Sequence, residues 1–381
     1  MTGQSPPASP DTPDTLRAWI DVDLGALSRN GALLARRAGA PLLPMVKADA
    51  YGLGAVPVAR ALERLDVWGF GVATVAEGRE LRAAGIARPV LIFTPLLAAE
   101  LPAAAEHALT PALHRAADIA AWAVTGRPWH LAIDTGMSRA GVRWDEIGDL
   151  VDAVRRHPPE GAFTHFHSAQ LADGSTSVQE RRFLDTLAAL PARPPIVHAE
   201  NSAALERCAG SPWTLARPGV FLYGVHSGAG VRVEPVAAMR ARVVDLRRVL
   251  DGETVSYDGA WTARGERRIA TLAIGYGDGY RRALGNRGTV LLRGRPAPVV
   301  GHVTMDMTMV DVTDLPCELG DVATLLGSDG EQSLGVVEVA RAGGLSPYEL
   351  LTGLRGRLSR RYLGDAATGH RSAAAATGVG T

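Results

Sequence analysis

From about residue 40 onward, short apolar runs rich in β-forming residues alternate with helical patterns, and this alternation constrains the fold most. Several runs lead directly into a helix. Thr74 and Glu77, for example, make a capping-box pattern, and Gly85 stands where that helix would end. Eight strands alternating with helices predict an α/β fold with a parallel (β/α)8 barrel of the TIM type. The eight runs lie at 42–48, 67–73, 89–94, 109–113, 129–134, 161–166, 195–199 and 213–219.

The pattern changes near residue 240, where strand-like runs follow one another closely and Gly-rich turns separate them. This change predicts a mainly β C-terminal domain after the barrel. Ser346, Pro347 and Glu349 mark the start of a closing helix, which places Tyr348 in its first turn. A further strand is expected at 17–24, ahead of the barrel. The predicted divisions are a disordered tail at 1–15, the barrel domain at 16–240, the β-rich domain at 241–363 and a second tail at 364–381.

Composition excludes several classes of protein. Lys+Arg and Asp+Glu both total 40, so the basic excess of a typical nucleic-acid-binding protein is missing. No apolar run is long enough to span a membrane, and the polar, Pro-rich N-terminus lacks the features of a signal peptide. Cys208 and Cys317 are too few for a disulfide framework. We therefore expect a cytoplasmic protein without nucleic-acid or membrane partners.

In a barrel of this type, functional side chains gather where the strands end. Lys47 lies at the end of the first run and precedes a loop punctuated by glycine. A lone lysine there is more often a rim residue whose stem covers apolar surface, but a lysine of lowered pKa can form a Schiff base. Arg139 follows the fifth run in I-D-T-G-M-S-R-A-G. It could be an ordinary loop arginine or a clamp for an anionic ligand.

Two histidines and a Ser-containing helix start follow later runs. His165 and His167 alternate on the sixth strand and are expected to face one side. No third ligand has suitable spacing, so no metal site is predicted, and His165 is interpreted as an oriented polar group at the barrel mouth. Asn201 and Ser202 open a helix after the seventh run. A serine there is usually an N-cap, although helix N-termini also bind phosphate.

Arg217 and Gly219 lie at the end of the eighth run, and barrels often bind phosphate in the loops after their last two strands. Tyr257 in V-S-Y-D-G and Tyr276 in I-G-Y-G-D-G-Y belong to the β-rich region. Ordinary packing in a β domain explains these two tyrosines as well as a functional role does, so their local sequence leaves both interpretations open.

Taken together, these segments resemble the alanine racemase family over nearly the whole chain, from about Ala18 to Tyr362 and in the family's order. V-K-A-D-A-Y-G-L-G looks like the family's cofactor-lysine signature. Each motif alone is weak, but their joint order and spacing make the resemblance specific. The other motifs are D-T-G-M-S-R-A-G, T-H-F, H-A-E-N-S-A-A, R-P-G, V-S-Y-D-G, I-G-Y-G-D-G-Y and M-D-M.

The resemblance implies an isomerase that interconverts L-alanine and D-alanine with pyridoxal 5'-phosphate and supplies D-alanine for peptidoglycan. It implies two catalytic bases: Lys47, which also holds the cofactor as an aldimine, and Tyr257 from the partner subunit of a homodimer. It further implies that Arg217 donates to the pyridine nitrogen beside His165. The other implied residues are Tyr51, Asn201, Ser202, Gly219, Val220 and Tyr348 around the cofactor and its phosphate, and Arg139, Met305 and Tyr276 at the substrate or the entrance.

These roles are chemically consistent. Racemisation removes the α-proton from one face and returns a proton to the other, so it needs two bases on opposite faces. An arginine does not give up its proton, so Arg217 would leave the pyridine nitrogen unprotonated. The ring is then a weaker electron sink, which should limit transamination and decarboxylation.

Some positions depart from the family's pattern. Ala132 stands where many members have a carbamylated lysine that supports the following arginine, and Asp258 stands where glycine is common. The segment F-H-S-A-Q-L-A-D-G is also unusual. A racemase acting on serine or a larger amino acid remains an alternative, because the sequence does not give the size of the side-chain pocket.

Two other functions are compatible with parts of the sequence. A decarboxylase on this architecture would place an acidic group at the pyridine nitrogen, which Arg217 argues against. A non-catalytic barrel protein of vitamin B6 homeostasis would lack a β-rich second domain, which residues 245–360 argue against.

Overall fold

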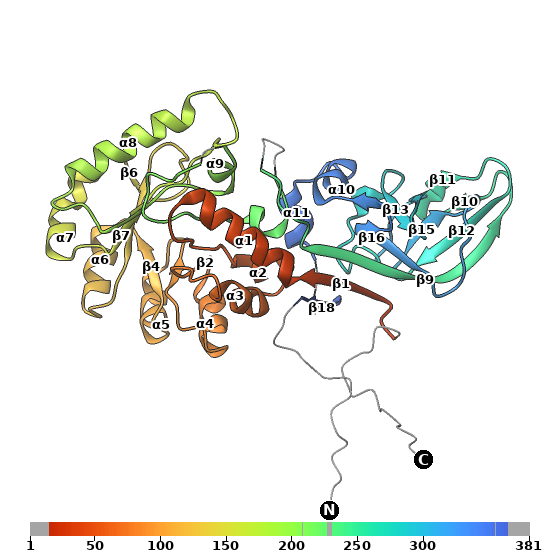
Figure 1. Cartoon of the computed structure of the whole chain (residues 1–381), viewed down its shortest axis with the longest axis horizontal. Helices are drawn as coiled ribbons and strands as arrows, with labels where there is room; N and C mark the ends of the chain where they lie inside the picture. The colour runs from red at the N-terminus through yellow and green to blue at the C-terminus, as the bar shows by residue number, and fades with distance from the viewer. Residues whose placement is uncertain (1–14, 208, 227–230, 355, 365–381) are drawn as a thin grey trace, which may run out of the picture.

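The computed structural model describes residues 15–207, 209–226, 231–354 and 356–364, which form an α/β barrel beside a β-rich sheet domain (Figure 1). The predicted tails lie outside the described residues, apart from Thr15 and Gly364. Within the described ranges, no helix combines the length and the apolar character needed to cross a membrane. Cys317 is buried and unpaired, and Cys208 lies outside the described residues.

The barrel contains parallel strands in the order β2-β3-β4-β5-β7-β8, with β6 paired to β5. The predicted first and eighth strands appear only as bridges, which link Leu42 to Ala216 and Met45 to Gly71. The Thr214 N–H bonds to Val197 O at 2.9 Å, so hydrogen bonds connect both ends of the sheet. Prolines in these two runs lack the N–H that a longer ladder requires. The (β/α)8 prediction is confirmed. The strands are β2 (Phe70–Val72), β3 (Val90–Ile92), β4 (Thr110–Leu113), β5 (His130–Asp134), β6 (Val142–Arg143), β7 (Gly161–Phe163) and β8 (Ile196–His198).

Helices cover the outside of the barrel (Figure 1). The capping box at Thr74 and Glu77 is present and begins α4, and Gly85 just after this helix has a φ of 82°. Short 3-10 turns directly precede α5 and α7, at Ala98–Glu100 and Ile147–Leu150. The helices are α1 (Leu24–Ala38), α3 (Ala55–Glu63), α4 (Val75–Ala83), α5 (Leu101–Glu106), α6 (Ala116–Ala123), α7 (Val151–Arg156), α8 (Ser175–Ala189) and α9 (Ser202–Arg207).

The second part is built around the long strand β9, which pairs with β1, β12 and β16. The strand expected at 17–24 therefore belongs to this sheet, where β1 also pairs in parallel with β18. The boundary between the two domains at residue 240 stays a prediction. The elements are β1 (Ala18–Asp23), β9 (Ala237–Val249), β10 (Thr254–Val255), β11 (Trp261–Thr262), β12 (Arg267–Leu272), β13 (Thr289–Leu292), β14 (Arg295–Pro298), β15 (Thr308–Asp311), β16 (Val322–Asp329), β17 (Gln332–Leu334), β18 (Ser359–Leu363), α10 (Val336–Ala342) and α11 (Pro347–Thr352).

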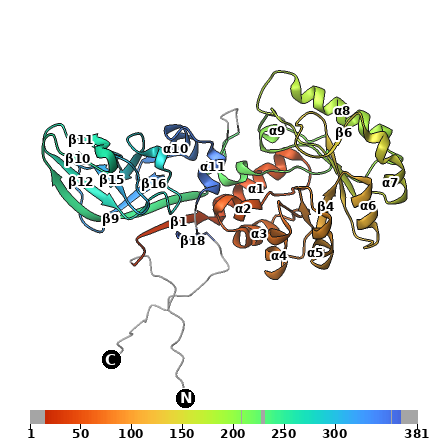
Figure 2. The same ribbon diagram turned by 180° about the vertical axis from the view of Figure 1, so that it is seen from behind.

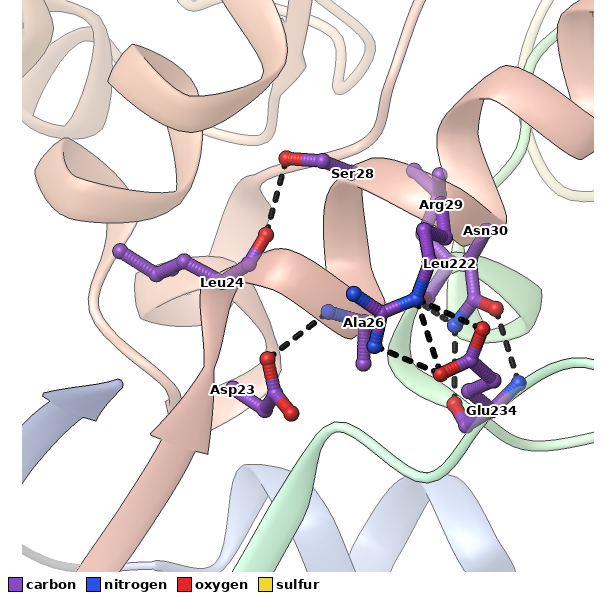
Figure 3. Close-up of polar contacts among 8 residues, drawn as sticks. All are labelled: Asp23, Leu24, Ala26, Ser28, Arg29, Asn30, Leu222 and Glu234. Atoms are coloured by element: carbon purple, nitrogen blue, oxygen red, sulfur yellow. Dashed lines mark hydrogen bonds and ion pairs between the residues drawn. The ribbon is translucent and has the colours of Figure 1, made fainter. Parts of the chain in front are cut away.

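The two parts meet along α1 and α11. Seen from behind, α11 lies between the barrel and the sheet (Figure 2). At α1, the Asp23 side chain accepts a hydrogen bond from Ala26 N, which caps the helix where β1 ends (Figure 3). The buried Asn30 amide donates to Leu222 O at 3.0 Å and Glu234 O at 2.9 Å and accepts from Glu234 N at 2.8 Å. These bonds fix the segment that leaves the barrel against its first helix.

Candidate active site

Lys47 is followed by a left-handed helical turn, α2 (Lys47–Gly52). Ala48, Asp49, Ala50 and Tyr51 have φ values of 53°, 55°, 51° and 57°. Each L-residue in this conformation costs about 1–2 kcal/mol relative to the right-handed form. The sequence predicted a loop punctuated by glycine, but the strained residues are not glycines. Strain of this kind persists where surrounding contacts enforce it, and it concentrates at functional sites.

Contacts from both parts of the molecule hold this turn. On the barrel side, Glu77 at the start of α4 accepts from Ala48 N at 2.8 Å. On the other side, Arg360 of β18 lies 3.1 Å from the Asp49 carboxylate and donates to Gly52 O at 2.8 Å. Asp49 also accepts from Ala55 N at 2.8 Å. The last described strand therefore helps to position the backbone next to Lys47.

Two adjoining cavities of about 440 Å³ and 250 Å³ open at the barrel mouth, and both are lined by Lys47, Arg139 and His165. The larger is within the usual range for small-molecule sites. Its lining includes the predicted residues apart from Tyr257, Tyr276 and Met305. Those in the larger cavity are Lys47, Tyr51, Arg139, His165, Asn201, Ser202, Arg217, Gly219, Val220 and Tyr348.

Lys47 is the only lysine in the chain, a signal that the sequence analysis missed. Burial lowers the pKa of its amine, and the nearby charge of Arg139 adds to this effect. A lowered pKa favours the unprotonated amine, which is the nucleophilic and basic form. Burial, followed by the charge of Arg217, lowers the pKa of His165 to about 3, so this imidazole is neutral.

Arg217 is buried in the wall of the larger cavity, and burial lowers its pKa to about 9, which still leaves it charged at neutral pH. Its Nη1 donates to His198 Nδ1 at 2.8 Å and to His198 O at 2.9 Å. Its Nη2 donates to the carbonyls of Thr164 at 2.7 Å and Ala199 at 2.9 Å, and lies 3.4 Å from His165 Nδ1. Both terminal nitrogens are thus used. The Nε–H is the donor without a partner among the described residues.

Neutral hydrogen-bonding groups gather on another wall of the cavity. Ser202 Oγ accepts from Gly219 N at 2.8 Å. The N-cap of α9 is Asn201, whose Oδ1 accepts from Ala204 N at 3.1 Å, so of the two interpretations of Ser202 the N-cap does not apply. A Cβ on Gly219 would lie 2.6 Å from the Tyr51 hydroxyl, so only glycine allows this approach. Burial raises the pKa of Tyr51, which keeps its hydroxyl a donor.

The two predicted histidines do not lie on a strand. The strand β7 ends at Phe163, where its pairing with β8 ends, so the argument from strand alternation was wrong. His165 is partly buried beside Arg217, whereas His167 is exposed and bonds to Ser168 Oγ at 2.7 Å. Among the residues that the structure describes, no three His, Cys, Asp or Glu side chains are grouped to hold a metal ion.

The three predicted residues outside the cavity lie in the β-rich part. Tyr257 is 69% exposed in a 3-10 turn (Tyr257–Gly259), and Met305 is 52% exposed. Tyr276 N bonds to Thr304 O, which brings the loops carrying Tyr276 and Met305 together. Asp258, which replaces the common glycine, has a φ of 61°, a conformation that aspartate tolerates better than most residues.

Arg139 and Ala132 both line the smaller cavity. The alanine offers no group to hold the arginine. Arg139 is exposed, and it makes no hydrogen bond or ion pair with the described part of the chain. Its guanidinium is therefore available to an anionic ligand.

His130 and His198 are fully buried behind Arg217, and neither is among the site residues predicted from the sequence. Each is a lone histidine within an otherwise apolar strand run, and that pattern was the available signal.

Comparisons with known proteins match one family over most of the chain. Family models described as "Alanine racemase, N-terminal domain" and "Alanine racemase, C-terminal domain" match residues 22–227 and 236–362. The alanine racemase of Deinococcus radiodurans is 39% identical over 354 residues, covering 91% of this chain and 99% of the relative. That of Halothermothrix orenii is 34% identical over 368 residues, covering 91% and 97%.

Solved structures give the same result. The alanine racemase of Streptomyces lavendulae has a TM-score of 0.88 at 30% identity and covers 94% of this chain and 100% of its own. The alanine racemase of Bartonella henselae, solved with covalently bound pyridoxal phosphate, has a TM-score of 0.84 at 30% identity and covers 91% and 100%.

The left-handed turn generates a stability prediction. Ala48→Gly should leave the free energy of unfolding unchanged or raise it, because losing a strain of about 1–2 kcal/mol offsets the entropy cost of glycine, about 0.5–1 kcal/mol. Ala120→Gly, at an exposed position inside right-handed α6, is the matched control and should lose about 1 kcal/mol. Denaturant unfolding measures both. Equal losses in the two variants would show that the turn is not strained as described.

Proposed function

The chain belongs to the alanine racemase family, and from this premise we propose that it interconverts L-alanine and D-alanine with pyridoxal 5'-phosphate as its cofactor. One observation carries the proposal. The only lysine, a buried arginine with one free donor and a wall of neutral hydrogen-bonding groups all line a single cavity.

The cavity residues fit this cofactor. Lys47 supplies the amine that would bond to the aldehyde. Tyr51, Ser202 and the loop after the eighth barrel segment supply neutral donors for the phosphate, in the region where barrels often bind phosphate. The Arg217 Nε–H remains for the pyridine nitrogen. When bound, pyridoxal phosphate accepts electron density from the α-carbon of the substrate.

We propose that Lys47 and Tyr257 are the two bases. The lowered pKa of Lys47 lets its amine take or return a proton on one face of the substrate. Tyr257 is exposed on the β-rich part and is absent from the cavity lining of its own chain. It would therefore act from the partner subunit of a homodimer, at the opposite face. Tyr276 and Met305, also exposed on that part, would approach the same entrance.

Arg217 and Arg139 would control the reaction in different ways. The fixed charge of Arg217 would keep the ring nitrogen unprotonated and so limit transamination and decarboxylation. Arg139, which has no partner among the described residues, would bind the substrate carboxylate. We further propose that the enzyme acts in the cytoplasm and that its product, D-alanine, is used for peptidoglycan. Rescue of a D-alanine-requiring bacterium by the expressed chain would test that role.

The residue to which pyridoxal phosphate becomes attached tests the cofactor assignment. The protein should bind one pyridoxal phosphate per chain and be yellow, and borohydride should fix the cofactor on Lys47, because no other lysine exists. Lys47→Arg keeps a cation at this position but lacks a nucleophilic amine, so it should show neither the colour nor alanine racemisation in a chiral assay. Peptide mass spectrometry that finds the reduced cofactor on the α-amino group would refute the assignment.

The shared-site proposal is tested by mixing two inactive proteins. Lys47→Ala and Tyr257→Ala should each be almost inactive. When the two are unfolded together and refolded, about half of the dimers are hybrids, and each hybrid has one intact site. Activity should therefore return to roughly a quarter of the wild-type value.

Each variant refolded alone is the control, and mass spectrometry of the intact dimers shows whether hybrids form. If hybrid dimers form without activity, Tyr257 does not act from the partner.

A further inference from the structure

Behind Arg217, the side chains of His198, His130 and Glu160 follow one another through the interior of the barrel. The Arg217 Nη1 lies 2.8 Å from His198 Nδ1, and His198 Nε2 lies 2.9 Å from His130 Nδ1. The remaining nitrogen, His130 Nε2, lies 3.7 Å from Glu160 Oε2. Both histidines have no exposed surface. The four side chains thus form a line whose first member is the proposed partner of the cofactor nitrogen.

The chemistry of the first member fixes the proton positions in the whole line. A guanidinium can only donate, so His198 Nδ1 must be an acceptor without a proton. Neutral His198 then carries its proton on Nε2 and donates it to His130 Nδ1. Neutral His130, in turn, carries its proton on Nε2, which points toward Glu160. Burial lowers the pKa of both imidazoles, which is consistent with two neutral rings.

Among the described residues, aromatic side chains pack on both rings. Phe163 stacks on His198 with ring centroids 5.1 Å apart, and Trp68 packs on His130 at 5.5 Å. A Cβ at Gly161 would lie 2.5 Å from the His130 ring, so the chain leaves space there for the imidazole. In such apolar surroundings hydrogen bonds strengthen and polarise one another.

Glu160 lies at the far end of the line. It immediately precedes β7, whereas Arg217 follows the last barrel segment, so the line crosses from the mouth of the barrel to its opposite end. His130 Nε2 is buried and has no hydrogen-bond partner among the residues that the structure describes. The Glu160 carboxylate is its nearest acid, and its side chain is 37% exposed, which leaves it free to move closer.

We propose that Glu160, His130 and His198 are positioning residues that form a directed relay and hold the Arg217 guanidinium in place. Glu160 closes the relay by accepting the His130 Nε2–H, which keeps His198 Nδ1 available to Arg217. The relay concerns Arg217 toward the cofactor and so rests on the proposed function. Its proton arrangement is a property of the protein alone and can be tested without activity.

The first test is ¹⁵N NMR of histidine-labelled protein without added cofactor. Both buried histidines should be neutral, with the proton on Nε2 and none on Nδ1. His130→Asn and His198→Asn assign the two signals. A proton on Nδ1 of either ring, or a doubly protonated ring, overturns the relay whatever reaction the enzyme performs.

The second test removes the terminal acceptor. In Glu160→Ala the His130 Nε2–H should lose its acceptor and exchange faster with water. The racemase kcat/KM should fall about tenfold, the scale expected when a functional group shifts slightly, and the share of turnovers ending in transamination should rise. Glu160→Gln retains an acceptor oxygen and should stay close to wild type in all three measurements.

Glu106→Ala, which removes an exposed carboxylate at the end of α5, is the matched control for loss of surface charge. If the wild type shows the expected tautomers but does not racemise alanine, the result counts against the proposed function and not against the relay. If Glu160→Ala behaves as Glu106→Ala does in proton exchange, kcat/KM and transamination, Glu160 does not close the relay and the proposal fails.

Discussion

The arrangement of the site depends on how the protein satisfies the buried charge of Arg217. A buried cation is costly unless hydrogen bonds replace its hydration. Here the carbonyls of Thr164, His198 and Ala199, all at the ends of β7 and β8, supply those bonds. Closure of the barrel places the segment that carries Arg217 beside β8. The Arg217 guanidinium therefore lies next to these carbonyl acceptors. Because the acceptors occupy both terminal nitrogens, only the Nε–H remains for a ligand.

A second constraint links Lys47 to the β-rich part. The left-handed turn after Lys47 would relax if its contacts were lost, and Arg360 of β18 supplies two of them. Within one chain, the sheet domain therefore contributes to the barrel mouth: β18 contacts the turn after Lys47, and α11 lines the cavity. In the proposed dimer it also serves the mouth of the partner, through Tyr257.

The sequence was informative where local chemistry decides structure. Strand and helix alternation predicted the barrel, Thr74 and Glu77 predicted a helix start, and residues after strand ends, such as Ser202, came together in one cavity. It failed where distant contacts decide. Nothing local in A-D-A-Y predicts left-handed residues, since Glu77 and Arg360 impose them. The pairing of His130 with His198 requires two strands to be placed side by side, and the exposed position of Tyr257 is meaningful only with a second subunit.

The central claim is that the Arg217 Nε–H faces the pyridine nitrogen and keeps it unprotonated. The most direct measurement is ¹⁵N NMR of the holoenzyme loaded with pyridoxal phosphate labelled at that nitrogen. The account predicts the shift of an unprotonated, hydrogen-bonded nitrogen, which does not change through the pH range in which free pyridine nitrogens titrate. A pyridinium shift at neutral pH would contradict it, because a protonated nitrogen cannot accept from an arginine.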